Sequence, residues 1–334
     1  MVRSGDRSRR TIARPIAVGS APGCEIRLDD PLHQVSRLHA RLVREGHKWI
    51  LRDGDSKNGL RVDGARRSEI VLEPGLEIGI GGITLIAESP LSIALRGFLA
   101  RLLGWGSDRA ESVDHALRSV RMAAARRAAL VLCGDGDLVS MAQSIHRHAR
   151  GADRRFVLCD PRRPRRKATV RSAESYATGM EALSVAAGGS VCVRTRRPPA
   201  DFDQLVEVLR APNMQVQLIL CAAALEDCKR YSLTPIVLPP LADRAAELDR
   251  IINEYAKDAM IDLAVSGAGF PPADVAWVRE HASSSLPEIE KATLRLVALR
   301  ASPSLSNAAA RLGMAPVSLS RWIGRRDMPM EIVQ

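Results

Sequence analysis

The sequence predicts a multidomain protein in which an all-β sandwich is followed by a three-layer α/β domain and an all-α C-terminal region. Three observations support this prediction. The length of 334 residues exceeds that of one ordinary domain. Apolar and polar residues alternate with period two across residues 11–88. From residue 128 onward strand-like and helical segments take turns, and beyond residue 240 the pattern is helical to the end.

The first region is rich in short alternating segments separated by Gly, Asp and Asn. Examples lie at residues 25–28, 49–51 and 78–86. Many short strands spaced by turn residues are typical of a β-sandwich, which we expect over residues 11–88. The period then changes to that of a helix, so residues 89–127 are predicted to form a helical linker.

The central region contains four apolar runs with the length of buried strands, at residues 129–133, 155–159, 190–193 and 216–221. Helical stretches separate them, one of them over about 138–150. This order predicts a parallel sheet covered by helices on both faces, over residues 128–236. Small helical units follow, with breaks at residues 266–272 and 283–285.

Composition narrows the functional classes. The net charge of +11 favours a polyanionic partner, although arginine supplies almost all of it and such a bias also arises from GC-rich coding. Six cysteines without a C-x-x-C pair are expected to be buried apolar residues and not metal ligands. No apolar run reaches the roughly 18 residues of a membrane helix, and no signal peptide is seen, so we expect a cytoplasmic protein.

Two motifs at a defined spacing lie in the sandwich region. Residues 35–40 are Val-Ser-Arg-Leu-His-Ala, and residues 53–59 are Asp-Gly-Asp-Ser-Lys-Asn-Gly. Together with Val-Gly at 18–19 and Leu-Glu-Ile-Gly at 76–79, they resemble the forkhead-associated (FHA) family. The resemblance implies loops at one end of the sandwich that bind a phosphothreonine peptide of a partner protein.

The loop residues suit a phosphate, which needs cations, hydroxyl donors and backbone N–H groups. The predicted phosphopeptide-binding residues are Ser20, Ser36, Arg37, Lys57, Asn58 and Gly59. His39 resembles the family's buried structural histidine. The family's usual Gly-Arg pair is Gly19-Ser20 here, which removes a charge-assisted contact worth roughly 1.5–3 kcal/mol. Three consequences of this loss remain open: weaker binding of the phosphopeptide, compensation for the missing arginine by Arg37 and Lys57, or use of the sandwich for docking without phosphate.

Residues 128–282 resemble the AAA+ domain of sigma-54-dependent enhancer-binding proteins. The resemblance rests on Ile-His-Arg at 145–147, Gly-Gly-Ser-Val at 188–191, and Leu-Pro-Pro-Leu-Ala-Asp-Arg at 238–244, which opens a helical lid remnant predicted over 237–282. The catalytic features are missing. The phosphate loop G-x-x-x-x-G-K-[ST] is replaced by Cys-Gly-Asp-Gly-Asp-Leu at 133–138, so Asp135 and Asp137 would repel phosphate.

Two further losses accompany the first. The third strand ends in Arg194 where the family has an Asp-Glu pair, and the segment before it is too short for the sigma-contact loop. We therefore predict a degenerate AAA+ domain with no catalytic residues, no metal site and no cofactor, although nucleotide binding without hydrolysis stays open. The basic run at 162–167 replaces the lost loop and is interpreted as a solvated loop or as a contact to DNA backbone.

Residues 286–326 predict three helices. Pro287 and nearby acids open the first, Ser304 starts the second, and Gly313 makes the turn into a third over residues 315–323. The pattern resembles the Fis-type helix-turn-helix of enhancer-binding proteins, which implies DNA binding as a dimer. The predicted DNA-binding residues are Ser318, Ser320, Arg321, Arg325 and Arg326. A helical hairpin used only for dimerisation is the alternative.

These predictions combine into a bacterial transcriptional regulator that couples phosphothreonine recognition to binding of double-stranded DNA. It would not be an enzyme, and would act as a homodimer or in co-assembly with an active relative. Two other functions stay open: an ATP-dependent sigma-54 activator, and a phosphopeptide adaptor that does not bind DNA.

Overall fold

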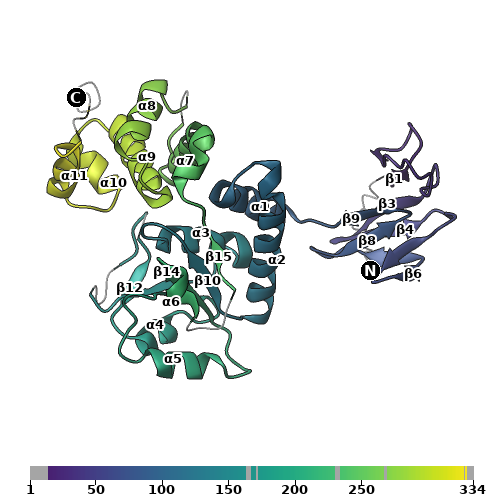
Figure 1. The fold of residues 1–334 in the computed structure, drawn as a ribbon, viewed down its shortest axis with the longest axis horizontal. Helices are drawn as coiled ribbons and strands as arrows, with labels where there is room; N and C mark the ends of the chain where they lie inside the picture. The colour runs from purple at the N-terminus through teal and green to yellow at the C-terminus, as the bar shows by residue number, and fades with distance from the viewer. Residues whose placement is uncertain are drawn as a thin grey trace, which may run out of the picture. The chain divides into compact units, whose positions relative to one another are not determined.

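The structure is a computed structural model that describes residues 14–162, 167–170, 172–229, 234–266, 269–326 and 328. The chain divides into two compact units, one ending at Ile93 and the other beginning at Ala94. Figure 1 shows the ribbon of both units.

The first unit is a sandwich of two sheets. One has the strand order β2-β1-β3-β4-β7 and the other β6-β5-β8-β9. The nine strands are β1 (Ile16–Gly19), β2 (Ile26–Arg27), β3 (Ala40–Glu45), β4 (Lys48–Asp53), β5 (Leu60–Val62), β6 (Ala65–Arg67), β7 (Glu69–Val71), β8 (Glu77–Ile80) and β9 (Ile83–Ile86). Alternating residues from both sheets, among them Val18, Leu51 and Ile80, fill the space between them. The predicted β-sandwich is confirmed.

The second unit begins with helices. Its first elements are α1 (Pro90–Leu103), the short 3-10 helix η1 (Ser107–Arg109) and α2 (Ala110–Arg126). A six-stranded parallel sheet follows, with the order β12-β11-β13-β14-β10-β15. Its strands are β10 (Leu130–Cys133), β11 (Phe156–Cys159), β12 (Glu174–Tyr176), β13 (Ser190–Arg194), β14 (Gln217–Ala222) and β15 (Ile236–Val237).

Helices cover both faces of this sheet, because successive strand residues point to opposite sides. Leu132, Cys192 and Ile219 share one apolar core with α2 and with α3 (Val139–Arg150). Alternate strand residues such as Val191 and Leu220 share another with the helices of the opposite face. Those helices are α4 (Gly179–Val185), α5 (Phe202–Leu209) and α6 (Leu225–Lys229). The predicted three-layer α/β architecture is therefore present (Figure 1).

Two edge strands were not anticipated from the sequence. β12 and β15 contain three and two residues, which is too short to produce a recognisable alternating pattern. Five of the six cysteines are buried, as expected, and none of the six forms a disulfide. None of the helices in the described part of the chain combines the length and apolar character that a membrane crossing requires.

The C-terminal part is helical. Its elements are η2 (Leu241–Glu247), α7 (Leu248–Asp262), α8 (Pro272–His281), α9 (Leu286–Arg300), α10 (Leu305–Arg311) and α11 (Pro316–Ile323). Helix α9 packs along α7 and also contacts α8 and α10. Leu294, Leu312 and Leu319 belong to the same apolar core as α2 and α3. The last three helices are therefore packed onto the α/β domain and are not an appended tail.

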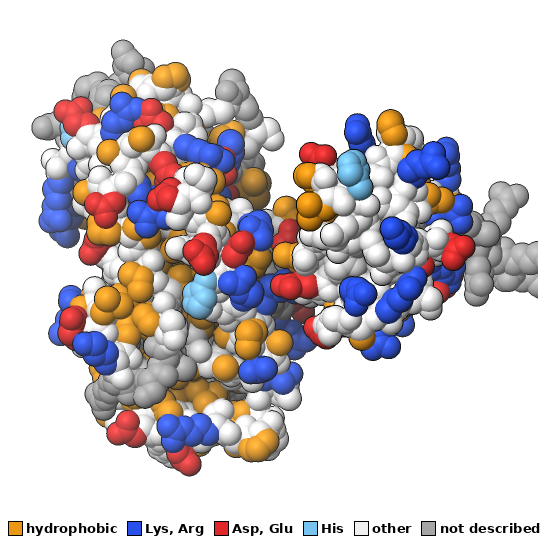
Figure 2. Space-filling model, turned by 45° about the vertical axis from the view of Figure 1, so that its right-hand side comes forward, with side chains coloured by type: hydrophobic (Ala, Val, Ile, Leu, Met, Phe, Trp, Pro, Cys, Tyr) orange, Lys and Arg blue, Asp and Glu red, His pale blue; other side chains and the backbone are white. Residues whose placement is uncertain are grey.

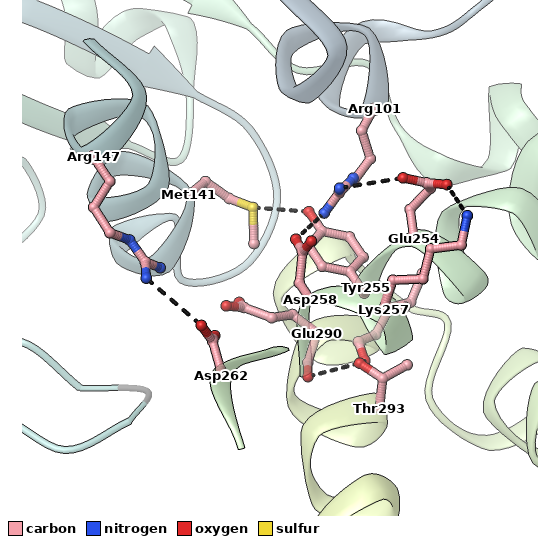
Figure 3. Close-up of polar contacts among 11 residues, drawn as sticks. Arg101, Met141, Arg147, Glu254, Tyr255, Lys257, Asp258, Asp262, Glu290 and Thr293 are labelled. Atoms are coloured by element: carbon pink, nitrogen blue, oxygen red, sulfur yellow. Dashed lines mark hydrogen bonds and ion pairs between the residues drawn. The ribbon is translucent and has the colours of Figure 1, made fainter. Parts of the chain in front are cut away.

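Polar contacts fasten this helical part to the helices before it (Figure 3). Arg101 of α1 pairs with Asp258 of α7, and its other nitrogen lies 3.5 Å from Glu254. The Tyr255 hydroxyl donates to the Met141 sulfur of α3 at 3.0 Å, and burial raises the pKa of this tyrosine. These contacts hold α7 against both α1 and α3.

Candidate functional site

The predicted phosphopeptide loops of the first unit are joined by one buried histidine. The Nδ1 atom of His39 accepts from the Ser36 backbone N–H at 3.1 Å, and its Nε2–H donates to the Gly59 carbonyl oxygen at 3.2 Å. His39 is fully buried. Its ring connects the loop after β2 to the loop after β4, so the predicted structural role of His39 is confirmed.

A second contact joins these two loops, each of which carries a cation. The Ser36 hydroxyl oxygen accepts from the Lys57 backbone N–H at 3.1 Å. Arg37 and Lys57 are exposed, and neither has an acidic partner among the residues the structure describes. The Ser36 hydroxyl proton and two cationic side chains thus share one end of the sandwich, which is the set of groups that a phosphate requires.

The remaining predicted residues of this site contribute to loop geometry. The Ser20 hydroxyl donates to the Val35 carbonyl at 3.1 Å, and the Asn58 amide donates to the Gln34 carbonyl at 2.7 Å. The Ser20 hydroxyl proton and one of the two N–H groups of the Asn58 amide are therefore occupied within the protein. Gly59 adopts a φ of 69°, as the predicted tight turn requires.

One cation near this site was missed in the sequence. Arg66 of β6 donates to the Ser56 carbonyl at 3.2 Å, and its side chain lies against Gly59. Only the hairpin of β5 and β6 brings it there, and a lone arginine in a basic stretch carries no signal. Lysine and arginine side chains are spread widely over the visible face of this unit, the right-hand body in Figure 2.

The carboxyl edge of the parallel sheet holds an ion-pair cluster. Arg194, at the end of β13, contacts Asp137 at 2.7 Å and Asp160 at 3.0 Å. Asp137 follows β10 and Asp160 follows β11. Three strands of the sheet therefore contribute: β11 lies beside β13, and β10 lies one strand further, beyond β14. Burial lowers the pKa of Arg194, but its hydrogen bond to Asp137 and the nearby negative charges outweigh this, and the pKa lies above its ordinary value.

This arrangement corrects one sequence expectation. Asp137 was expected to repel a phosphate, but its carboxylate is paired with Arg194. A cavity of about 320 Å³ adjoins the cluster, lined in part by Gly136, Ser175 and Lys291. In open α/β sheets ligands bind at this edge. Here the edge carries an internal salt bridge between side chains of the protein.

The C-terminal helices adopt the predicted order. Ser304 caps α10, because its hydroxyl accepts from the Asn307 N–H at 3.2 Å. Gly313 turns the chain with a φ of 64°, and Pro316 begins α11. Leu319 and Trp322 are buried. Helices α10 and α11 thus form a short helical hairpin whose inner face is apolar.

The outer face of α11 is open. Val317 is 60% exposed, and Ser318, Ser320 and Arg321 are also exposed. Arg325, just after the helix, is exposed as well. Neither arginine has an ion-pair partner within the described ranges of the chain. These four predicted residues therefore share one accessible surface.

Arg326 differs from its neighbour. It pairs with Glu288 of α9 at 2.5 Å, and its guanidinium stacks 5.1 Å from the centre of the Trp322 ring. Arg295 of α9 lies 4.8 Å from that ring, and Trp277 of α8 meets it edge to face. The prediction that Trp322 is a packing residue is confirmed. It anchors α11 to α8 and α9.

The comparisons with known proteins concern the first unit. The family model described as FHA domain matches residues 16–81. Similar solved structures include one from a study of phosphothreonine-dependent FHA domain interactions (29% identity, TM-score 0.21, 22% of this chain and 76% of that one). The Slr1951 protein of Synechocystis sp. is 30% identical (TM-score 0.21, 22% and 79%). Mycobacterium tuberculosis EmbR, solved with a low-affinity phosphopeptide, is 31% identical (TM-score 0.20, 23% and 21%). No curated protein matches the chain.

Proposed function

The chain contains an FHA domain at residues 16–81, and from this premise we propose that it is a transcriptional regulator. It couples recognition of a phosphothreonine peptide to sequence-specific binding of double-stranded DNA and does not hydrolyse ATP. The observation that carries the second half is the open face of α11, a helix that Trp322 anchors, with Arg321 on the helix and Arg325 just after it, both exposed. A helix held in this way suits the major groove.

The phosphopeptide half rests on the cluster around Ser36. A phosphothreonine carries nearly two negative charges and three acceptor oxygens. The Ser36 hydroxyl donates to one oxygen, and Arg37 and Lys57 supply the charge that the absent Gly-Arg pair does not. Because Arg66 lies beside Gly59, it adds a further cation at this end of the sandwich.

The α/β domain with its following helices is, in this proposal, a degenerate AAA+ domain, and the final three helices are a Fis-type helix-turn-helix. The Arg194 cluster supports the loss of hydrolysis. A phosphate-binding edge needs a lysine and a magnesium ligand, whereas here a guanidinium occupies the end of β13 and is neutralised by Asp137 and Asp160. The domain then serves as the scaffold between the two binding modules.

Binding of phosphothreonine is tested with the full chain and a library of phosphothreonine peptides, with the matched unphosphorylated peptides as reference. Arg37→Ala is expected to weaken phosphopeptide binding by about 1.5–3 kcal/mol, since it removes a charge-assisted contact. Lys48→Ala is the control, because Lys48 is an exposed cation at the opposite end of β4. Equal affinity for phosphorylated and unphosphorylated peptides would reject this half.

DNA binding and ATP turnover are tested on the same preparation. Sequences selected by the full chain from random duplexes are expected to bind more tightly than unrelated DNA, with salt-dependent affinity and no ATP turnover. Turnover above background would instead support an ATP-dependent activator. Indifference to DNA at low salt would leave a phosphopeptide adaptor.

A further inference from the structure

The loop between β11 and β12 lies against the turn of the helical hairpin, 144 residues later in the sequence. A β-carbon at Gly313 would lie 3.0 Å from Cβ and from Cγ2 of Thr169. Thr169 is itself held in place, because its N–H donates to the Ser172 carbonyl at 2.8 Å and its hydroxyl accepts from the Ser172 N–H at 3.1 Å. The α/β domain therefore touches the residue that turns the chain into α11.

A second contact confirms where this loop lies. Val170, next to Thr169, lines a cavity of about 200 Å³ together with Ile261 of α7 and Leu294 of α9. Helix α7 is fixed to α1 and α3 by the contacts of Arg101 and Tyr255 (Figure 3). The loop, the long helices and the hairpin thus belong to one packed arrangement.

Lys167 carries a positive charge at this junction. It is exposed and stands two residues before Thr169, so their Cα atoms are at most about 7 Å apart. Among the described acids of the neighbouring helices, Glu288 pairs with Lys291 and Arg326, and Asp262 lies 3.9 Å from Arg147. Lys167 itself has no ion-pair partner in the described chain. Its charge is thus available to a ligand from outside.

We propose that Lys167 binds a DNA phosphate beside the groove that α11 enters, so that the α/β domain contributes a second contact to the duplex. This inference rests on the proposed function, because it needs α11 to meet DNA. Phosphates line both sides of the major groove, and cations next to a recognition helix set its register without reading bases. The contact comes from a loop that packs on the hairpin turn and not from the hairpin itself. Residues 163–166, which complete the basic run, lie outside the described residues.

The test uses the full chain and DNA duplexes that it selects, with affinity measured between 50 and 200 mM salt. Lys167→Ala is expected to weaken binding to selected and unrelated DNA by the same factor, roughly three- to tenfold, and to reduce the slope of log K against log salt by about 0.9. Lys167→Arg keeps the charge and is expected to restore both values. The control is Arg155→Ala, because it removes the same single charge from an exposed cation just before β11, at the opposite edge of the sheet.

The outcomes separate the two proposals. An unchanged slope in Lys167→Ala, together with loss of sequence discrimination in Arg321→Ala, overturns the second contact and leaves the proposed function standing. A loss in Lys167→Ala that Arg155→Ala reproduces also overturns it, since the net charge of the protein then explains the effect. Wild-type protein that ignores DNA at low salt overturns both.

Discussion

Two regions of the second unit contain arginines that the sequence analysis singled out. In one region the arginine is paired with carboxylates, and in the other the arginines are exposed. At the carboxyl edge of the sheet, Arg194 is largely buried and contacts two carboxylates. Arg321 on α11 and Arg325 just after it are exposed and lack acidic partners among the residues described. At the sheet edge the arginine is therefore occupied by carboxylates of the protein, whereas the arginines of the hairpin can bind an external anion.

The comparison shows that the number of cations in a region does not decide whether the region can bind an anion. What decides it is how many of those cations are left without an acidic partner. Residues 286–326 contain seven arginines and lysines against two acids. Of those seven, Lys291 and Arg326 pair with Glu288 and Arg300 pairs with Asp274. Arg311, Arg321 and Arg325 lie on the hairpin and have no acidic partner among the described residues, whereas at the sheet edge the protein supplies its own counterions.

Arg194→Ala is expected to have the largest effect. It leaves Asp160, of which 7% of the side chain is exposed, without its cation, and removing one member of a buried ion pair costs about 3 kcal/mol of unfolding free energy. Denaturant unfolding of the second unit measures this. The control is Arg210→Ala, whose pair with Glu207 is exposed, so that a change within about 0.5 kcal/mol is expected. Similar losses of unfolding free energy in both variants would mean that the ion pairs of Arg194 are as solvated as the exposed pair of Arg210.

Arg321→Ala is expected to have the next largest effect, on discrimination between DNA sequences. An arginine that reads a guanine contributes about 1–3 kcal/mol of preference for the correct base pair. Competition between selected and scrambled duplexes measures that preference. Arg118→Ala, an exposed arginine of α2, should leave it unchanged. If Arg321→Ala discriminates between selected and scrambled duplexes as well as the wild type does, Arg321 does not read bases.

Arg325 and Arg326 form a matched pair that sharpens the comparison. Arg325→Ala is expected to reduce the salt slope of DNA binding by about 0.9, as loss of one phosphate contact does. Arg326→Ala is expected to change the slope less, because its charge is already paired with Glu288. It should instead lower the melting temperature, since it also packs on Trp322. Equal slopes in the two variants would contradict the distinction between paired and available arginines.

Local features of the sequence were sufficient for much of the architecture. The predicted start of α9 matches the structure because Pro287 and the acids that follow it act within one turn of the helix. Ser304 and Gly313 likewise act on their immediate neighbours. The FHA motifs were recognisable because two short segments at a fixed spacing hold the residues of the loops.

Contacts between distant segments could not be predicted. Arg194 and Asp137 are 57 residues apart, and only the parallel register of the sheet brings them together. Glu288 meets Arg326 across 38 residues, and Thr169 meets Gly313 across the whole helical region. In each case the charge or size of a residue was visible in the sequence, but its partner depended on how helices and strands pack.

The smallest effect is expected from pH, and it separates stability from binding. Burial lowers the pKa of His146, whose Nδ1 accepts from the Ser190 hydroxyl and whose Nε2–H donates to the Arg154 carbonyl. The unfolded chain therefore takes up a proton near pH 6.5 that the folded chain resists, so stability is full above pH 6.5 and falls as pH decreases below it. Melting temperatures at pH 5.5 and 7.5 are expected to differ less in His146→Gln, which keeps a donor and an acceptor. Burial also lowers the pKa of His148, so this second histidine should maintain part of the difference in melting temperature.

Arginines do not titrate in this range, so the salt slope of DNA binding should stay constant while stability changes. A slope that follows the melting temperature would place a titrating histidine, and not only Arg321 and Arg325, at the DNA surface.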